Sequence, residues 1–136
     1  MSIMRVIGIA CAILLIAACF YPWVTIESKA IVVSGVEATG TSFGKPGYFH
    51  LLLSIIYIVL FVVNNLWSNR INIFLAAFNL AWAVRNFMLI SMCHGGECPV
   101  KHTALYVVLV SSIAMLLAIF LNKTRIRNSE ILQDSV

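Results

Sequence analysis

Charged residues are scarce in this chain, and acidic residues are the rarer kind. Asp and Glu number five, Lys and Arg nine, and together they make up 10% of 136 residues. So little charge excludes the highly charged type of disordered chain, and three Pro with seven Gly exclude a collagen-like or Pro/Gly-rich one. Hydrophobic residues fill 62% of the chain, against about 45–50% in soluble domains. We therefore expect a single integral membrane domain over 1–136.

Several catalytic signatures are also missing. The sequence has no HExxH motif, no nucleophile elbow, no CxxC pair and no Asp or Glu inside a long apolar stretch. These absences argue against a zinc protease, a hydrolase and a proton-driven carrier. The Gly44-Lys45 pair is followed by Pro46 instead of Ser or Thr, which excludes a Walker-type nucleotide site. The sequence therefore favours a non-enzymatic role with no resident cofactor.

Four apolar stretches are long enough to cross a bilayer as helices. A hydrocarbon core of about 30 Å needs about 20 apolar residues, because each helical residue rises ~1.5 Å. The stretches cover about 6–26, 48–67, 71–92 and 104–121. The first ends in Phe-Tyr-Pro-Trp at 20–23, which is typical of a membrane interface. We predict an all-α, four-helix transmembrane bundle.

Basic residues between the stretches predict the orientation. One side carries Arg5, Arg70, Lys123, Arg125 and Arg127, and the other carries Lys29, Lys45 and Lys101, offset by Glu27, Glu37 and Glu97. Cytoplasmic loops carry the excess of Lys and Arg. We therefore expect a bacterial inner-membrane protein with both termini cytoplasmic, outer loops at 27–47 and 93–103, and a cytoplasmic tail at 122–136. The net charge of +4 then reports topology, and no nucleic-acid partner is expected.

An alternative applies to the first stretch. The tetrad Ile-Ala-Ala-Cys at 16–19 resembles the lipobox of a bacterial lipoprotein signal. Cleavage before Cys19 would leave three spans. The apolar run continues to Ile26, which favours retention of the helix, and the alternative stays open.

The loops predict two local features. Ala-Ile-Val-Val at 30–33 is followed by Ser-Gly, which predicts a short β-hairpin on the bilayer surface. The glycine-containing segment 40–47 predicts a tight turn at the start of a helix, with Lys45 as a candidate contact for a lipid headgroup. Only Ser-Asn-Arg at 68–70 separates two spans, which predicts an antiparallel helical hairpin.

The third stretch carries an unusual polar pattern. Asn72, Asn79 and Asn86 recur every seven residues. On a helix, Trp82 and Arg85 lie beside them, within an arc of about 120° around the axis. Polar groups are costly in hydrocarbon, so this face should look into the bundle. We predict an outward-facing pocket formed by Asn79, Trp82, Arg85 and Asn86 for a lipid phosphate, a carboxylate or a quinone oxygen.

A structural explanation of the same pattern also stays open. In it, Arg85 pairs with Glu27 or Glu37 of the outer loop, and the asparagines only join helices. His50 and His102, without a carboxylate at helical spacing, are expected to be surface or interface residues.

Cys93 and Cys98 enclose a short glycine-containing turn, and we predict a disulfide there because the outer compartment is oxidising. An alternative makes them the catalytic pair of a thiol-disulfide oxidoreductase that uses a membrane quinone. A metal site formed by Cys93, His94, Cys98 and His102 is not expected, because the adjacent Cys93 and His94 are awkward joint ligands. Cys11 and Cys19 lie ~12 Å apart on one helix and cannot bridge each other.

Four segments are distinctive in combination: FYPW at 20–23, GTSFGKPG at 40–47, AWAVRNF at 81–87 and CHGGECP at 93–99. Together they resemble a family of small bacterial four-span membrane proteins that has no assigned function. The resemblance implies a four-helix fold in the cell envelope and supplies no activity. We expect an accessory or scaffold subunit, or a lipid- or small-ligand-binding protein, whose partners are membrane lipids and another protein or a second copy.

Overall fold

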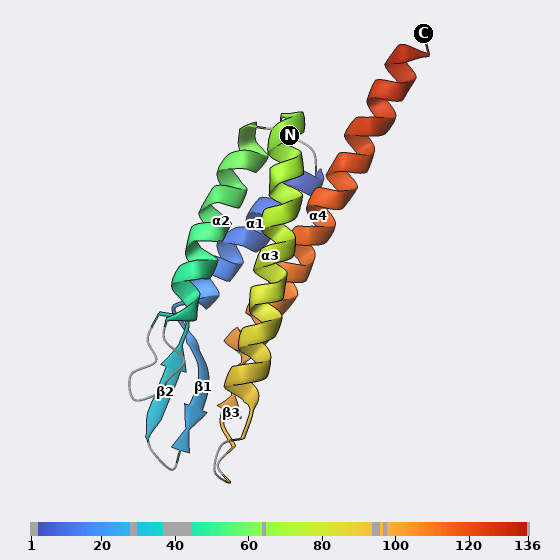
Figure 1. Ribbon diagram of the computed structural model, residues 1–136. Helices are drawn as coiled ribbons and strands as arrows, with labels where there is room; N and C mark the ends of the chain where they lie inside the picture. The colour runs from blue at the N-terminus through green and yellow to red at the C-terminus, as the bar shows by residue number, and fades with distance from the viewer. Residues whose placement is uncertain are drawn as a thin grey trace.

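Four helices and a small sheet make up the computed structural model, which describes residues 3–27, 30–36, 45–63, 65–93, 96 and 98–135, apart from the side chains at 46 and 123–126. The helices lie side by side, and the sheet extends from one end of them (Figure 1). The elements are α1 (Ile3–Ala18), β1 (Pro22–Ile26), β2 (Ile31–Ser34), α2 (Pro46–Val63), α3 (Leu66–Ser91), β3 (Val100–Lys101) and α4 (Thr103–Asp134). The predicted four helices are confirmed, whereas the three-stranded sheet corrects the all-α prediction.

The first helix is shorter than hydropathy predicts. α1 ends at Ala18, and Pro22–Ile26 form β1, which corrects the predicted continuous span over 6–26. Pro22 cannot continue a helix, and the residues after Trp23 are β-branched. The indole Nε1 of Trp23 donates to the carbonyl oxygen of Ala18 at 3.0 Å and so satisfies one of the last acceptors of the helix. The end of the predicted span, Pro22–Ile26, therefore belongs to a sheet.

The sheet joins the beginning of the chain to its last third. β1 is the central strand, and β2 and β3 pair with it in antiparallel fashion, with Val24 opposite both Val33 and Lys101. The predicted strand near 30–33 is confirmed, but its partner precedes it in the chain. Predicted turn residues at 40–44 lie outside the described part. The amide of Gly47 donates to the carbonyl of Gly35 at 2.6 Å, which holds the start of α2 against the end of β2.

The second and third helices are antiparallel neighbours, as their short connection predicts (Figure 1). The turn comes earlier than the predicted 68–70, because α3 begins at Leu66. Asn65 caps the helix: its side-chain oxygen accepts from the amide of Trp67 at 3.1 Å. Asn is among the best N-cap residues, so the cap sets this boundary and residues 68–70 are helical.

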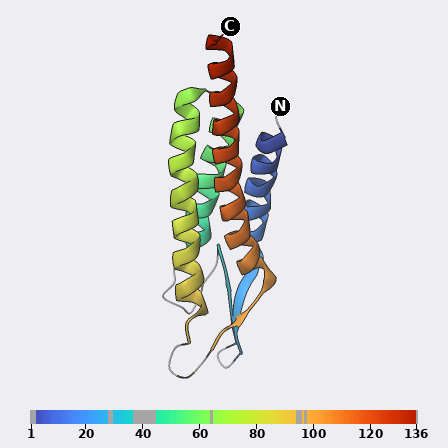
Figure 2. The same ribbon diagram turned by 90° about the vertical axis from the view of Figure 1, so that its right-hand side faces the viewer.

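The last helix runs along the bundle and continues past it (Figure 2). α4 includes both the predicted span over 104–121 and most of the polar tail. Its principal neighbours are α1 and α3. By length and composition, α3 and α4 are able to cross a membrane, whereas α1 and α2 are apolar but shorter.

Large apolar side chains cover the outside of the bundle, and amides and hydroxyls lie inside it. Phe74 is 71% exposed and Val63 is 59% exposed, whereas Asn72 and Ser112 are fully buried. The interior also contains an apolar core that includes Leu15, Trp23 and Phe61, but this distribution departs from the pattern expected in water by its many exposed large apolar side chains. It is the pattern that hydrocarbon favours, because hydrocarbon penalises unpaired polar groups.

Candidate functional site

The polar face of α3 divides between the bundle interior and the surface. Asn79 and Asn86 are almost fully buried, Trp82 is half-buried and Arg85 is exposed. Residues 85 and 79 differ by about 120° around a helix, which is enough to place them on different faces. The four residues predicted to form one ligand pocket therefore occupy two environments, and each needs its own explanation.

The buried asparagines join the helices. Asn79 Oδ1 accepts from His50 Nδ1 of α2 at 2.5 Å, and its amide nitrogen lies 3.9 Å from Met115 Sδ of α4. About two helical turns earlier in α3, the Asn72 amide donates to the carbonyl of Tyr57 at 3.1 Å. The Tyr57 hydroxyl in turn donates to the carbonyl of Met115 at 2.9 Å. The prediction that the asparagines face inward is confirmed, and these contacts connect α2, α3 and α4.

His50 is part of this interior network. Its side chain is fully buried, and its ring lies edge-on to Trp23 with the centroids 6.3 Å apart. The expected surface or interface position is therefore corrected: His50 lies in the core. The sequence signal was weak, because the partner Asn79 lies 29 residues away on another helix.

Arg85 lies on the outer surface of α3 beside an aromatic ring. Its guanidinium carbon is 5.0 Å from the centroid of the Trp82 ring, and Trp82 packs on Phe49 with centroids 4.8 Å apart. Within the described residues, no ion pair joins Arg85 to Glu27; Glu37 lies outside them. The ring supports the cation by a cation–π interaction, and the forked donors stay available to an anion.

Two lysines at the same end are also stacked on rings. Lys45 Nζ lies 5.6 Å from the Tyr48 ring centroid, and Lys101 Nζ lies 5.8 Å from that of Phe87. Both lysines are exposed. Lys45 thus lies on the surface, where a lipid headgroup could reach it, and its contact with a headgroup stays a prediction.

Cys93 and Cys98 form a disulfide, with Cα atoms 4.2 Å apart. Both residues are exposed, between the end of α3 and the start of β3. The predicted bridge is confirmed. Cys11 and Cys19 are free thiols. Among the described residues, which do not include His94, no three His, Cys, Asp or Glu side chains gather into a metal site.

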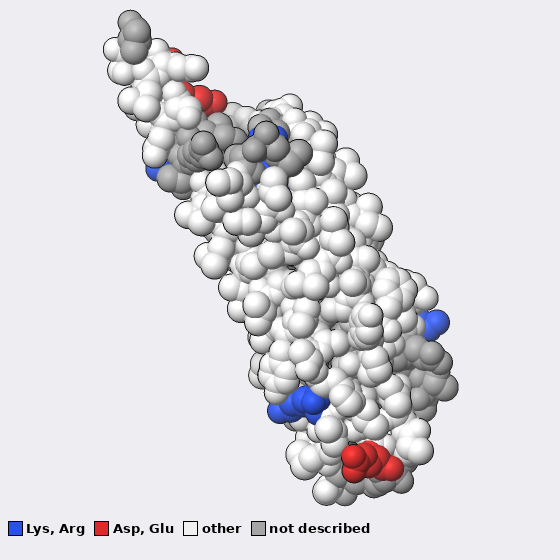
Figure 3. All heavy atoms as spheres, turned by 180° about the vertical axis from the view of Figure 1, so that it is seen from behind, with Lys and Arg blue, Asp and Glu red and all other residues white. Residues whose placement is uncertain are grey.

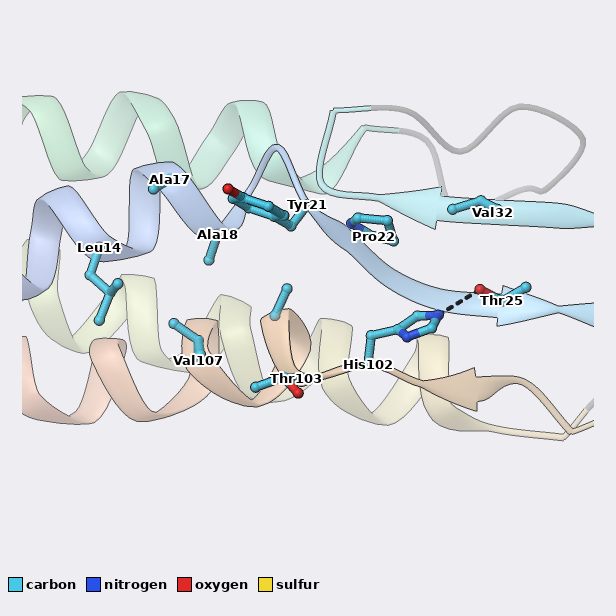
Figure 4. Close-up of a pocket in the computed structure, with 11 residues that line it drawn as sticks. Leu14, Ala17, Ala18, Tyr21, Pro22, Thr25, Val32, His102, Thr103 and Val107 are labelled. Carbon is cyan, nitrogen blue, oxygen red and sulfur yellow. Dashed lines mark hydrogen bonds between the residues drawn. The ribbon is translucent and has the colours of Figure 1, made fainter.

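A pocket of about 580 Å³ lies on the other side of the molecule, where α1, β1, β2 and the start of α4 meet. We call it the outer pocket. Its lining consists of Leu14, Ala17, Ala18, Tyr21, Pro22, Thr25, Val32, His102, Thr103, Ala104 and Val107. Figure 4 shows the side chains from α1 and β1 facing those from α4 across this space.

One hydrogen bond closes the sheet end of the outer pocket. Thr25 Oγ1 and His102 Nε2 are 2.6 Å apart (Figure 4). The backbone amide of His102 donates to the carbonyl of Trp23 at 2.8 Å, so the ring is positioned by β1 and by the first turn of α4. Sequence reasoning missed this site, because its residues come from segments about 80 positions apart that meet only through the pairing of β1 with β3.

Comparison with protein-family models, with curated proteins and with solved structures finds no match to this chain. Its function is therefore argued from its own geometry.

Proposed function

We propose that this chain is a multi-pass protein of the bacterial inner membrane that binds lipid at its outer end and catalyses no reaction. All four helices cross the membrane, both termini are cytoplasmic, and the sheet and the disulfide turn lie outside. Its partners are membrane lipids and a further protein or second copy to which it serves as an accessory subunit.

The surface supports this placement. On the face in Figure 3, charged atoms lie toward the two ends, and the surface between them is uncharged. Exposed Phe, Leu, Ile and Val side chains occur on all four helices. Their contact with water would be unfavourable, at about 25 cal/mol per Å² of apolar surface. A bilayer removes that cost.

The lengths of the helices are compatible with a thin hydrophobic belt. α1 has 16 residues and α2 has 18, which correspond to about 24 and 27 Å at ~1.5 Å per residue. A bilayer core of about 30 Å adapts to such helices by thinning locally, at a modest cost. α3 and α4 are long enough without adaptation.

The exposed position of Arg85 on α3 is the observation that supports lipid binding. Arg85 lies six residues beyond Asn79, whose partner His50 is four residues from the start of α2, so it is about level with that start, at the outer edge of the proposed belt. Its neighbours Val84 and Met88 are exposed apolar residues, so in the proposed orientation the guanidinium faces lipid. An unpaired cation there is costly. A phospholipid phosphate offers the bidentate partner that Arg prefers, and the Trp82 ring holds the cation in place.

Replacement of Arg85 tests the phosphate site. The full-length protein is purified from vesicles with equal parts of phosphatidylglycerol and a diglycosyl diacylglycerol, which carries no phosphate, and the retained lipids are counted by native mass spectrometry. Arg85→Gln should lower the preference for phosphatidylglycerol about tenfold, because a charge-assisted hydrogen bond contributes about 1.5–3 kcal/mol. Arg85→Lys should lose part of it, because an ammonium lacks the fork.

The matched control is Arg127→Gln, which removes an exposed positive charge from the far end of α4. It should leave the lipid preference unchanged. Equal preference in wild type and Arg85→Gln would contradict the proposal.

A second candidate function is quinone-linked thiol oxidation. The exposure of Cys93 and Cys98 favours it, because a redox pair must be reachable by its substrate. A substrate dithiol would be oxidised to a disulfide while the pair is reduced, and two electrons and two protons would then pass to quinone, giving quinol. A pair that stays oxidised below about −300 mV is a structural bridge and rejects this function.

A further inference from the structure

We infer that the outer pocket binds one uncharged amphiphile from the outer leaflet, a lipid whose head carries a carbonyl or hydroxyl group and no charged group. This inference uses the membrane placement proposed above. It concerns a site on a different face from Arg85, so either site can fail without the other.

The outer pocket has the size and the lining of a ligand site. Its volume of about 580 Å³ falls within the range of about 300–1,000 Å³ that is typical of small-molecule sites. Most of its lining is apolar, with a few hydrogen-bonding side chains. Such sites take ligands that are largely hydrocarbon and are oriented by a few polar contacts.

The polar and apolar ends of the outer pocket are separated along the bundle axis. Leu14, Ala17 and Val107 lie at the end toward the middle of the bundle, and Thr25 and His102 lie at the end toward the sheet (Figure 4). In the proposed orientation the sheet is outside the membrane, so the polar end is at headgroup depth. A lipid of the outer leaflet has the same direction, with its head toward the sheet and its tail toward Leu14.

Among the described residues, no Asp, Glu, Lys or Arg lines the outer pocket. A charged head would lose its hydration here without meeting an opposite charge, which costs several kcal/mol. An uncharged head avoids this cost. The outer pocket therefore selects against the phospholipids that the Arg85 site attracts.

The Thr25–His102 pair provides hydrogen bonds for such a head. When the Thr25 hydroxyl donates to His102 Nε2, the ring proton lies on Nδ1, and this N–H group can donate a hydrogen bond to a ligand carbonyl. In the other tautomer, Nε2 donates to Thr25 and the hydroxyl proton becomes available to a ligand. Carbonyl-bearing and hydroxyl-bearing heads are thus both accommodated.

The walls of the outer pocket are held by contacts that do not involve a ligand. Trp23 donates from its indole to Ala18 and accepts at its carbonyl from the amide of His102. These two bonds connect α1, β1 and the start of α4. A site that is already ordered binds without the entropy cost of assembling it.

Photolabelling tests the inference directly. The full-length protein in phosphatidylcholine nanodiscs is irradiated with a diacylglycerol that carries a diazirine in one chain, and labelled peptides are mapped by mass spectrometry. Label is expected on residues 14–18 and 104–107. Ala17→Phe should reduce it about tenfold, because the ring fills the tail end of the outer pocket. Ala77→Phe is the matched control, since Ala77 is also an exposed helical alanine and lies on α3.

Competition identifies the head. Unlabelled diacylglycerol and a prenylated benzoquinone are compared with phosphatidylglycerol as competitors, and stronger competition by one uncharged lipid identifies the source of the carbonyl. His102→Phe should weaken competition by the uncharged lipids about fivefold, which is the effect of one lost hydrogen bond. Arg85→Gln should leave the label unchanged.

Three results would overturn the inference: label spread evenly over all four helices, equal labelling of Ala17→Phe and Ala77→Phe, or competition by phosphatidylglycerol as strong as that by diacylglycerol. Thermal unfolding of each variant in detergent excludes misfolding as the cause of a lost label.

Discussion

His50 and His102 each form one side-chain hydrogen bond to a residue of another element, yet their surroundings differ. His50 of α2 is fully buried against α3 and the Trp23 ring, and its partner Asn79 is buried as well. His102 is half-buried at the sheet end of the outer pocket, and its partner Thr25, which also lines this pocket, is half-buried as well. We therefore propose that the same residue type serves as a fastener where packing encloses it and as a binding group where packing leaves space.

The largest effect should follow from breaking the enclosed pair. His50→Leu leaves Asn79 Oδ1 buried without its donor, and a buried unsatisfied group costs about 1–3 kcal/mol. We expect the free energy of unfolding, measured by SDS titration in mixed micelles, to fall by that amount. Asn79→Leu should cost about as much.

The double variant His50→Leu/Asn79→Leu sharpens this test. Removing both partners leaves no orphaned group, so the double variant should be more stable than the sum of the single effects predicts, with a coupling of about 1 kcal/mol. Strictly additive effects would mean that the hydrogen bond contributes nothing and that only packing was lost.

An intermediate effect is expected at the disulfide. Cys93→Ser/Cys98→Ser should lower stability by about 2 kcal/mol or less, because the closed loop is short. β3 begins two residues after Cys98, so faster amide hydrogen exchange should appear in β3 and leave the amides around His50 unchanged. Faster exchange around both histidines would show that the two regions are not independent.

The smallest effect on stability should come from the open pair. His102→Phe removes one bond that is reachable by solvent, so the free energy of unfolding should change by less than about 1 kcal/mol. The same variant should lose selectivity for uncharged lipids. If its thermal midpoint falls as far as that of His50→Leu, the distinction between fastener and binding group is wrong.

The sequence predicts the helices well and the pocket not at all. The seven-residue spacing of Asn72, Asn79 and Asn86 is a local property of one helix, and so their inward orientation follows from periodicity. Arg85 follows the same periodicity only loosely, and its exposed position depends on where α2 and α4 pack. Local patterns determine a helical face, and tertiary packing decides which edge of that face stays covered.

The predicted ends of helices and strands are wrong for a related reason. Hydropathy does not distinguish a buried strand from the end of a span, so it predicts a helix at Pro22–Ile26 although Pro22 and the β-branched residues after Trp23 favour a strand. The outer pocket lies beyond sequence patterns altogether, because Thr25 and His102 are 77 residues apart and meet only after β1 pairs with β3.

The central place of β1 sets an order for biogenesis. Its second partner, β3, immediately precedes α4, so the sheet stays incomplete until the chain has been synthesised past Lys101. Contacts between such distant segments form late and slowly. The outer pocket also needs residues 102–107, so a nascent chain that ends within α3 still lacks one wall of it.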